Sequence, residues 1–312
     1  MGKTNFFVLI CLGVLVLLFP LVISDSYNLT IGVFAGVNAL LALGLCVLMG
    51  FAGQASLGQA GFYGIGAYIS AILSIKYGLP VALSMVIAAI VSGISAIMIA
   101  VPALRLRGHY LAVATLGFGE IVYVLLNELG PGGPSGFGDI PHLNLFGYIF
   151  ESSLSNFYLV WCFVLLVIIF SFNLVNSRIG RAMKAIHDSE VASNAMGLDV
   201  AALKIKVFIL SAIYASFAGS FYAHFVTFLS PSTFSLFQSI LVLMMVILGG
   251  ASNLWGAILG AIIITILPEA LRKFEELDVL VYGIILTLSL LFMRKGIVPL
   301  IIDKLKVEKK HA

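Results

Sequence analysis

Few side chains in this sequence could do chemistry, and one of them is a carboxylate within an apolar stretch. Glu120 lies eleven residues into the apolar stretch 109–127, about 16 Å from its start at the 1.5 Å rise of a helix. That depth is near the middle of a bilayer, where a carboxylate facing lipid is unfavourable. We therefore expect Glu120 to face a bundle interior or to carry a proton. It serves either a pathway across the membrane or a structural hydrogen bond to backbone freed near Gly117 and Gly119.

A second polar group lies in the glycine-rich segment Gly50–Gly66, which reads GFAGQASLGQAGFYGIG. Its six glycines include Gly58 and Gly61, and two amides, Gln54 and Gln59, stand where an apolar helix should begin. Glycine allows two helices to pack closely, and it also allows a helix to be interrupted. Non-helical backbone inside a bilayer must be covered by protein or line an aqueous cavity. We interpret the segment as a break that lines a pathway, with close helix packing as the alternative.

A second glycine-rich joint occurs late in the sequence, at Gly249–Gly260, which reads GGASNLWGAILG. Each of the two joints follows one apolar stretch and precedes another. Corresponding joints of this kind can mark the internal repeats of membrane transporters. The likeness between the two segments is weak at the level of single residues, so it indicates a repeat only in outline.

The longest polar stretch is Arg178–Lys206, which holds eight charged residues and must lie outside the bilayer. Within it, Asp188 or Ser189 can cap the start of a helix, and Gly197 can end it. These signals predict a helix of about two turns from Ser189 to Met196. Asp199 can then start the next membrane helix.

This short helix carries Glu190 in its first turn and a small apolar face. Val191, Ala192, Ala195 and Met196 form that face, because residues at these spacings lie on one side of a helix. A helix this short is marginal alone in water and needs a surface to lie on. It either packs on the end of its own bundle or docks in a groove of a soluble partner.

The sequence contains no enzyme or metal-site motif. Cys11, Cys46 and Cys162 lie far apart in apolar runs without a histidine or cysteine at ligand spacing, which favours packing roles over a disulfide or metal site. It also has no H-E-x-x-H, nucleophile elbow, dinucleotide fingerprint or phosphate-binding loop. We expect no catalytic residue, no metal ligand and no cofactor, and nothing indicates binding to nucleic acid.

Composition defines the elements that must position these residues. The chain has 312 residues, of which 61% are hydrophobic and 10% charged, whereas soluble domains carry about 25% charged residues. The sequence therefore predicts an all-α, polytopic membrane helix bundle that forms a single transmembrane domain over 1–312. Because a span needs about 20 apolar residues, we expect about ten transmembrane helices. They lie at 5–24, 29–50, 55–75, 80–103, 109–127, 156–176, 206–228, 236–252, 255–271 and 279–293.

The distribution of Lys and Arg sets the orientation. With ten spans, 14 of the 17 basic residues lie on one side, which the positive-inside rule makes cytoplasmic. Both termini are then cytoplasmic, 177–206 is a cytoplasmic loop, and 294–312 is a basic cytoplasmic tail. Removing two adjacent helices keeps this pattern, so eight spans fit as well. The outside loop 128–155 is either a contact for an external partner or a plain connector.

Several segments resemble the permeases of branched-chain amino-acid ABC importers, of the LivM type. They follow the order of that family, and they extend over nearly the whole chain. The resembling segments are Gly50–Tyr68, Leu104–Ile121, Gly130–Gly136, Arg178–Val200, Leu229–Ala261 and Leu291–Ile297.

The resemblance implies a non-enzymatic subunit of the bacterial inner membrane that moves leucine, isoleucine and valine into the cytoplasm. Its implied partners are a second homologous permease, two cytoplasmic ATPase subunits that hydrolyse ATP, an extracytoplasmic substrate-binding protein, and membrane lipid. The loop 177–206 becomes the coupling loop. The implied ATPase-coupling residues are Glu190, Val191, Ala192, Ala195, Met196 and Gly197. The implied pathway residues are Gln54, Gly58, Gln59, Gly61 and Glu120.

One position departs from the general importer motif. Glu190 lies seven residues before Gly197, where that motif has six. We therefore expect the apolar face, more than Glu190 itself, to contact the ATPase.

Three other functions stay open on the sequence. The chain could pass urea or another small solute of the same superfamily. It could be a secondary transporter driven by an ion gradient, although Glu120 is the only ionisable residue expected deep in a span. A scaffold membrane protein without transport is the third, and the glycine-rich joints argue mildly against it.

Overall fold

The computed structural model of the chain describes residues 3–22, 25–103, 109–145 and 148–270, together with 281, 283, 284 and 287. Over these residues the structure is almost entirely helical, as composition predicts. Its only strands are two residues long each and pair as a short hairpin. The helices are α1 (Lys3–Val22), α2 (Ser26–Leu45), α3 (Gln59–Lys76), α4 (Val81–Ala103), α5 (His109–Leu129), α6 (Ser153–Asn176), α7 (Arg178–Asp188), α8 (Glu190–Ala195), α9 (Val200–Val226), α10 (Leu236–Gly249) and α11 (Leu254–Ala270).

Shorter elements join the helices. A π-helix, η1 (Cys46–Phe51), continues α2, and two 3₁₀ turns, η2 (Gly133–Ser135) and η3 (Pro231–Phe234), lie in the loops. The hairpin strands are β1 (Asn144–Leu145) and β2 (Tyr148–Ile149), which pair antiparallel.

Among the described residues, five helices are long and apolar enough to cross a membrane: Ser26–Phe51, Val81–Pro102, Tyr110–Leu129, Ser153–Asn176 and Val200–Val226. Shorter apolar helices lie at Val8–Val22, Leu236–Gly249 and Leu254–Glu269. Nine of the ten expected stretches therefore contain a helix, but not all are of spanning length. The tenth, 279–293, lies almost wholly outside the described residues. The count of ten and the cytoplasmic termini stay predictions, as does the basic tail 294–312, which is not among the described residues.

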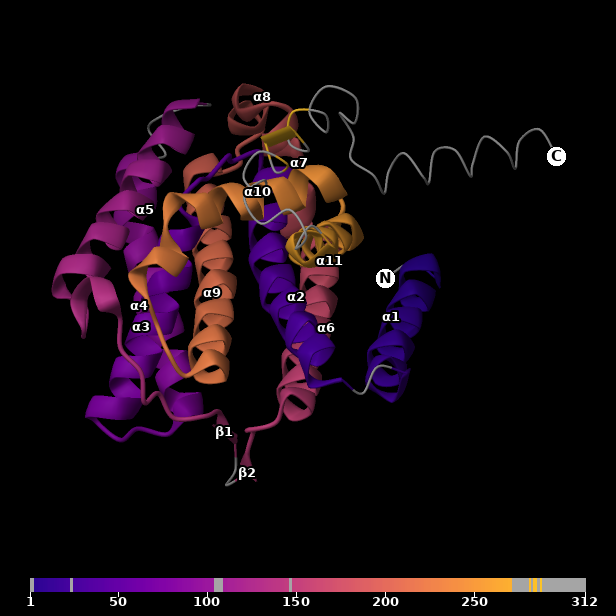
Figure 1. Ribbon diagram of the computed structural model, residues 1–312. Helices are drawn as coiled ribbons and strands as arrows, with labels where there is room; N and C mark the ends of the chain where they lie inside the picture. Colours follow the sequence, from indigo (N-terminus) through magenta and orange to yellow (C-terminus); the bar gives the residue numbers. More distant parts are fainter. Residues whose placement is uncertain are drawn as a thin grey trace.

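The long helix α9 is the centre of the bundle. It packs against α3 and α4 on one side and α2 on the other, while α6 and α11 pack on α2 (Figure 1). Small residues make the α3–α9 contact close. A Cβ on Gly66 would overlap the backbone of Ser216, and one on Gly219 would overlap the carbonyl oxygen of Tyr63. Packing through small residues is how helices associate inside membranes.

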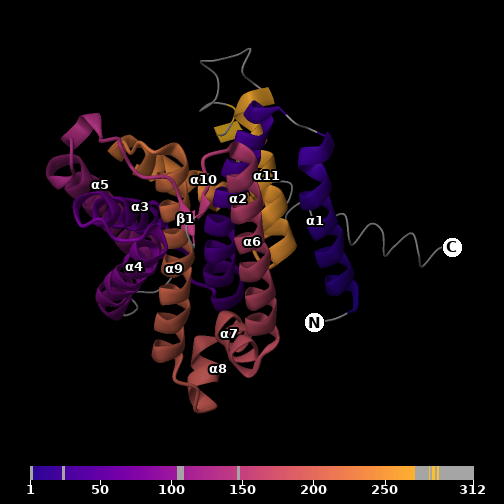
Figure 2. The ribbon, with the colours of Figure 1, turned by 90° about the horizontal axis from the view of Figure 1, so that it is seen from below.

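Helices α1 and α5 lie at opposite edges of the bundle in both views (Figures 1 and 2). Helix α1 packs on α6, with the rings of Phe19 and Phe157 stacked at 5.4 Å between centroids. Helix α5 packs mainly on α3. Only 17% of the residues in the most apolar stretch of α5 are buried, against 83% of those in the corresponding stretch of α2 with η1. Most of the α5 surface is therefore uncovered in the single chain.

The end of the bundle remote from α7 and α8 is closed by two loops that pair with each other (Figure 1). The Gly/Pro-rich loop after α5 and the loop after α9 exchange two backbone hydrogen bonds of 2.9 Å between Phe137 and Leu229. The buried side chain of His224 adds a third connection. Its Nδ1 donates to the carbonyl of Pro141 at 2.7 Å, so its Nε2 accepts from the hydroxyl of Ser70 at 2.7 Å. These two hydrogen bonds give this histidine a packing role.

Candidate functional site

The helical structure is interrupted between α2 and α3, as the glycine-rich segment predicts. Helix α2 ends in the π-turn η1, and the chain is not helical from Gly53 until α3 begins at Gln59. Gly53 has φ +67°, a left-handed conformation that glycine adopts without strain. Helix α3 therefore begins four residues later than the expected start of the span at 55.

Two amides, Gln54 in the break and Gln59 at the start of α3, bond to α9. Gln54 and Gln59 are each 1% exposed. Gln54 Nε2 donates to the backbone carbonyl of Lys204 at 3.3 Å, and Gln59 Nε2 donates to Ser211 Oγ at 2.9 Å. These hydrogen bonds explain why two amides occur where an apolar helix should begin. They support the packing interpretation for the chain alone, and the lining of a pathway stays a prediction.

Two glycines, Gly58 at the end of the break and Gly61 in α3, pack against α5. A Cβ on Gly58 would lie 2.8 Å from the carbonyl oxygen of Thr115, and one on Gly61 would lie 3.1 Å from the ring of Phe118. The hydroxyl of Thr115 also accepts a hydrogen bond from Leu57 N at 3.0 Å. The break and the first turn of α3 are thus attached to α9 by the two amides and to α5 by the two glycines.

The two glycine-rich joints of the sequence touch each other. Cys46 Sγ donates to the carbonyl of Ala251 at 3.1 Å, and Ser252 Oγ donates to the carbonyl of Gly50 at 3.1 Å. A Cβ on Gly50 would overlap the Ala251 carbonyl, so the backbones meet directly. The sequence marks both joints but contains no sign that they meet.

Glu120 points away from this bundle. Its side chain is exposed, as are its neighbours Val113 and Val124 on the same helix face, and none of the described residues shares a hydrogen bond with it. The expectation that it faces the bundle interior or bonds to nearby backbone is wrong for the single chain. The reason is that α5 offers its other face, around Thr115 and Phe118, to the small residues of α3.

The polar loop contains one helix that sequence reasoning missed. Helix α7 starts after Ser177, whose hydroxyl accepts from Gly180 N at 3.3 Å. Its buried side chains, Met183 and Ile186, are 0% and 2% exposed. Their i, i+3 spacing behind a serine cap is a signal that could have predicted the helix.

Helix α8 has the predicted caps. The hydroxyl of Ser189 accepts from Ala192 N at 3.3 Å. At the other end Gly197 has φ +81°, its N–H donates to Asn194 O, and the N–H of Leu198 donates to Ser193 O. This pair of bonds is a Schellman motif. Asp199 then caps α9 by accepting from Ala202 N at 2.9 Å, so α9 begins at Val200.

The apolar face of α8 is uncovered. Val191 is 70% and Met196 81% exposed, and Ala192 and Ala195 are exposed as well. The side that faces the bundle carries Ser193, which is 2% exposed. Packing of the apolar face on its own bundle, one of the two alternatives, is therefore wrong for this chain.

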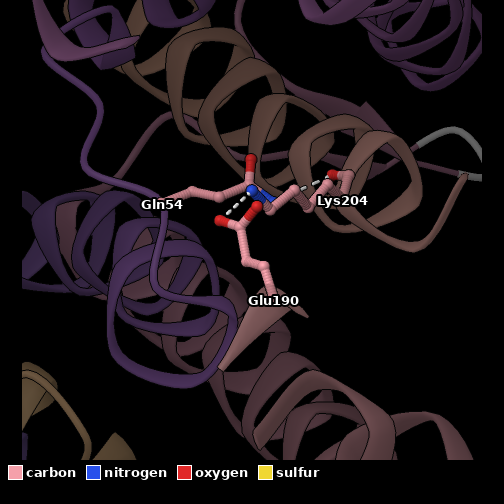
Figure 3. Close-up of polar contacts among 3 residues, drawn as sticks. All are labelled: Gln54, Glu190 and Lys204. Carbon is pink, nitrogen blue, oxygen red and sulfur yellow. Dashed lines mark hydrogen bonds and ion pairs between the residues drawn. The ribbon is translucent and has the colours of Figure 1, made fainter. Parts of the chain in front are cut away.

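Glu190 points toward the bundle. Its carboxylate accepts from Lys204 Nζ at 2.5 Å, and the Lys204 side chain is only 8% exposed. Figure 3 shows Glu190, Lys204 and Gln54 converging from α8, α9 and the break. The sequence predicts the start of both helices but not this ion pair, because its partners are 14 residues apart across a turn.

Several described helices are long enough to span a bilayer. A non-helical segment separates α2 from α3, and α5 presents a carboxylate at the edge of the bundle. These features are typical of a multi-pass membrane permease. Comparison with family models agrees with this class. Residues 28–290 match the family described as "Branched-chain amino acid transport system / permease component". The chain belongs to this family.

Curated relatives extend the match over almost the whole chain. The chain is 34% identical, over 329 residues, to the "High-affinity branched-chain amino acid transport system permease protein LivM" of Salmonella typhimurium, covering 97% of the chain and 77% of the relative. The protein of the same name from Escherichia coli gives the same values. A "Probable branched-chain amino acid transport permease protein LivM" from Methanocaldococcus jannaschii is 23% identical over 243 residues, or 70% of the chain and 68% of the relative. No solved structure matches the chain.

Proposed function

We propose that this chain is the transmembrane permease subunit of an ATP-driven importer that brings leucine, isoleucine and valine into the cell. Family membership carries the proposal, because the match covers residues 28–290 and the named relatives are permeases for branched-chain amino acids. Hydrolysis of ATP belongs to two separate ATPase subunits on the cytoplasmic side of the bacterial inner membrane.

The coupling loop 177–206 is the part of the chain on which those ATPase subunits act. The exposed apolar face of α8, formed by Val191, Ala192, Ala195 and Met196, supports this, since such a face is unfavourable in water and suited to a groove. Gly197 contributes by ending the helix there. Glu190 contributes indirectly, because its carboxylate is held by Lys204.

The end of the bundle that carries α7 and α8 is proposed as the cytoplasmic end. The N-terminal end of α1 lies on this side in both views (Figures 1 and 2). Arg178, Arg181 and Lys184 of α7 are there, whereas Lys76, at the end of α3, is at the opposite end. This bias is the one that the positive-inside rule associates with the cytoplasm. The paired loops of the opposite end then face outside, where a substrate-binding protein would deliver its ligand.

The exposed face of α5 is proposed as the contact with the second permease subunit and as one wall of the pathway. A carboxylate in the middle of a span is strongly unfavourable against lipid, so Glu120 must meet protein or water. The space beside Gly117 is open, with nothing within 4 Å of a Cβ built there. Gly58, Gly61, Gln54 and Gln59 support the pathway from behind α5 in this arrangement.

Uptake is expected to require hydrolysable ATP and to survive collapse of the proton gradient. The test is uptake of labelled leucine into proteoliposomes that hold the purified complex, with ATP, with a non-hydrolysable analogue, and with an uncoupler. A chain driven by an ion gradient would instead lose uptake with the uncoupler. Uptake of urea but not leucine would contradict the proposed substrate, and uptake without the ATPase subunits would contradict the proposal as a whole.

Replacing Glu120 with glutamine is expected to lower uptake, because it removes the charge from the face of α5 that is proposed to line the pathway. The proposed partner of Glu120 lies outside this chain, and a hydrogen bond to a charged group contributes about 1.5–3 kcal/mol, so we expect a loss of about tenfold or more in rate. The control is Glu128→Gln, the same change on the same helix near its outer end, which should keep uptake within about twofold because exposed charges contribute little. If Glu120→Gln transports like the parent, the charge of Glu120 has no role in transport.

A further inference from the structure

We infer that the break, defined as residues 53–58, is the relay that passes movement of α7 and α8 to α5, and that Glu190 and Lys204 are the positioning residues that attach it. The inference rests on the proposed coupling function. It assigns a role to an ion pair that docking of the apolar face leaves unexplained, and it connects the ATPase end of the chain to Glu120.

Helix α7 lies directly against the entrance to the break. Lys184 Nζ is 5.7 Å from the centroid of the Phe51 ring, a cation–π contact. One turn further along, a Cβ on Gly53 would lie 2.9 Å from His187 Cδ2, so the histidine ring packs on the bare backbone. Lys184 and His187 are three residues apart and therefore share the helix face that meets the break.

Helix α8 is attached to the same segment through a single residue of α9. Lys204 donates from its ammonium group to Glu190, and its backbone carbonyl accepts from Gln54 (Figure 3). A charge as buried as Lys204 is strongly unfavourable without its partner. If the ATPase displaces α8, we expect Lys204 to move with Glu190, because this keeps the ion pair intact. The hydrogen bond from Gln54 to the Lys204 carbonyl then transmits this movement to the break.

The far end of the break is fixed to α5. Leu57 N donates to Thr115 Oγ1 at 3.0 Å, and Gly58 lies against the Thr115 carbonyl. Thr115 is five residues before Glu120 on the same helix. The residues from Gly53 to Gly58 have no helix of their own. A segment tied at both ends and lacking helical hydrogen bonds can change its φ and ψ angles as a hinge does, which lets α5 move relative to α3.

The arrangement also divides α8 between two tasks. Its apolar face is turned outward and is free for the ATPase, while its acidic residue is turned inward to Lys204. Substitutions on the two sides should therefore fail differently: the apolar face should affect assembly, and Glu190 should affect the transfer of movement after assembly.

The test uses the full complex in proteoliposomes and measures amino acids imported per ATP hydrolysed, together with co-purification of the ATPase subunits. We expect Glu190→Gln and Lys204→Met to retain the ATPase within about twofold, as exposed-face contacts are unchanged, but to lower the import per ATP at least tenfold. The reversed pair, Glu190→Lys with Lys204→Glu, should recover a large part of the loss. Matched controls are Glu128→Gln and Lys76→Met, both exposed and outside the coupling loop, which should behave like the parent.

A variant at the other end of the relay keeps the inference testable if the ion-pair variants fold poorly. Thr115→Val removes the acceptor of Leu57 without touching α8, and should also lower the import per ATP while the ATPase stays bound. Loss of the ATPase from Glu190→Gln would overturn the inference by making Glu190 a docking residue. An unchanged import per ATP in the ion-pair variants or Thr115→Val would overturn it as well. A parent complex without ATP-driven uptake would refute the proposed function instead.

Discussion

Replacing Met196 with glutamate is expected to abolish uptake by releasing the ATPase subunits, while the permease itself folds normally. Met196 is 81% exposed and lies at the end of α8, so a glutamate side chain, which is of similar length, meets no atoms of its own chain. The parent helix should place this methionine in an apolar groove of the partner. Burying a methionine contributes about 1.5–3 kcal/mol, which the variant loses.

The introduced carboxylate adds a second penalty, because burying an unpaired charge is far more unfavourable than losing an apolar contact. Together the two effects should exceed about 4 kcal/mol, or roughly a thousandfold weaker docking. The measurements are co-purification of the ATPase subunits and ATP-driven uptake. Asn194→Glu is the control: it puts the same charge on α8, on an exposed residue outside the apolar face, and should retain both. Retention of the ATPase by Met196→Glu would show that the apolar face does not dock it.

Replacing Gly66 with leucine is expected to prevent folding of the bundle. A Cβ at Gly66 would overlap the backbone of Ser216 on α9, and backbone cannot rotate away as a side chain can. Overpacking of a core typically destabilises by about 1–3 kcal/mol, and a clash with backbone in the central helix contact should exceed that. The detergent-solubilised variant should therefore elute as aggregate, with less than about a tenth of the parent's monodisperse peak.

Gly13→Leu is the matched control for this substitution. Gly13 lies on α1, where a Cβ meets nothing within 4 Å, so the same change should leave the elution profile and thermal midpoint unchanged. A monodisperse Gly66→Leu protein with the parent's thermal midpoint would mean that α3 and α9 do not pack as closely as described.

Local signals in the sequence predict most of the elements around the site. The cap at Ser189, the stop at Gly197 and the start at Asp199 each depend on one residue and its next few neighbours. The break needs only Gly53 and the surrounding glycines. Each of these features is determined within one or two turns of chain, and the hydrogen bonds found in the structure are the ones that the residue types favour.

Features that depend on distant residues could not be predicted. Which face of α5 packs inward is decided by the glycines of α3, and this turns Glu120 outward. The ion pair between Glu190 and Lys204 depends on the angle between two helices. The number of spans also stays open, since α10 and α11 are shorter than a bilayer requires and their depth depends on neighbours.

The meeting of the two glycine-rich joints has a consequence for biosynthesis. Its hydrogen bonds join residues 205 and 202 positions apart in the chain. At about 5–20 residues per second, a ribosome needs roughly 10–40 s to reach Ala251 after completing Cys46. During that interval the end of α2 lacks the carbonyl and hydroxyl that later cover it. The η1 turn is therefore covered only after the chain beyond α10 has been made, so an interrupted chain leaves it uncovered.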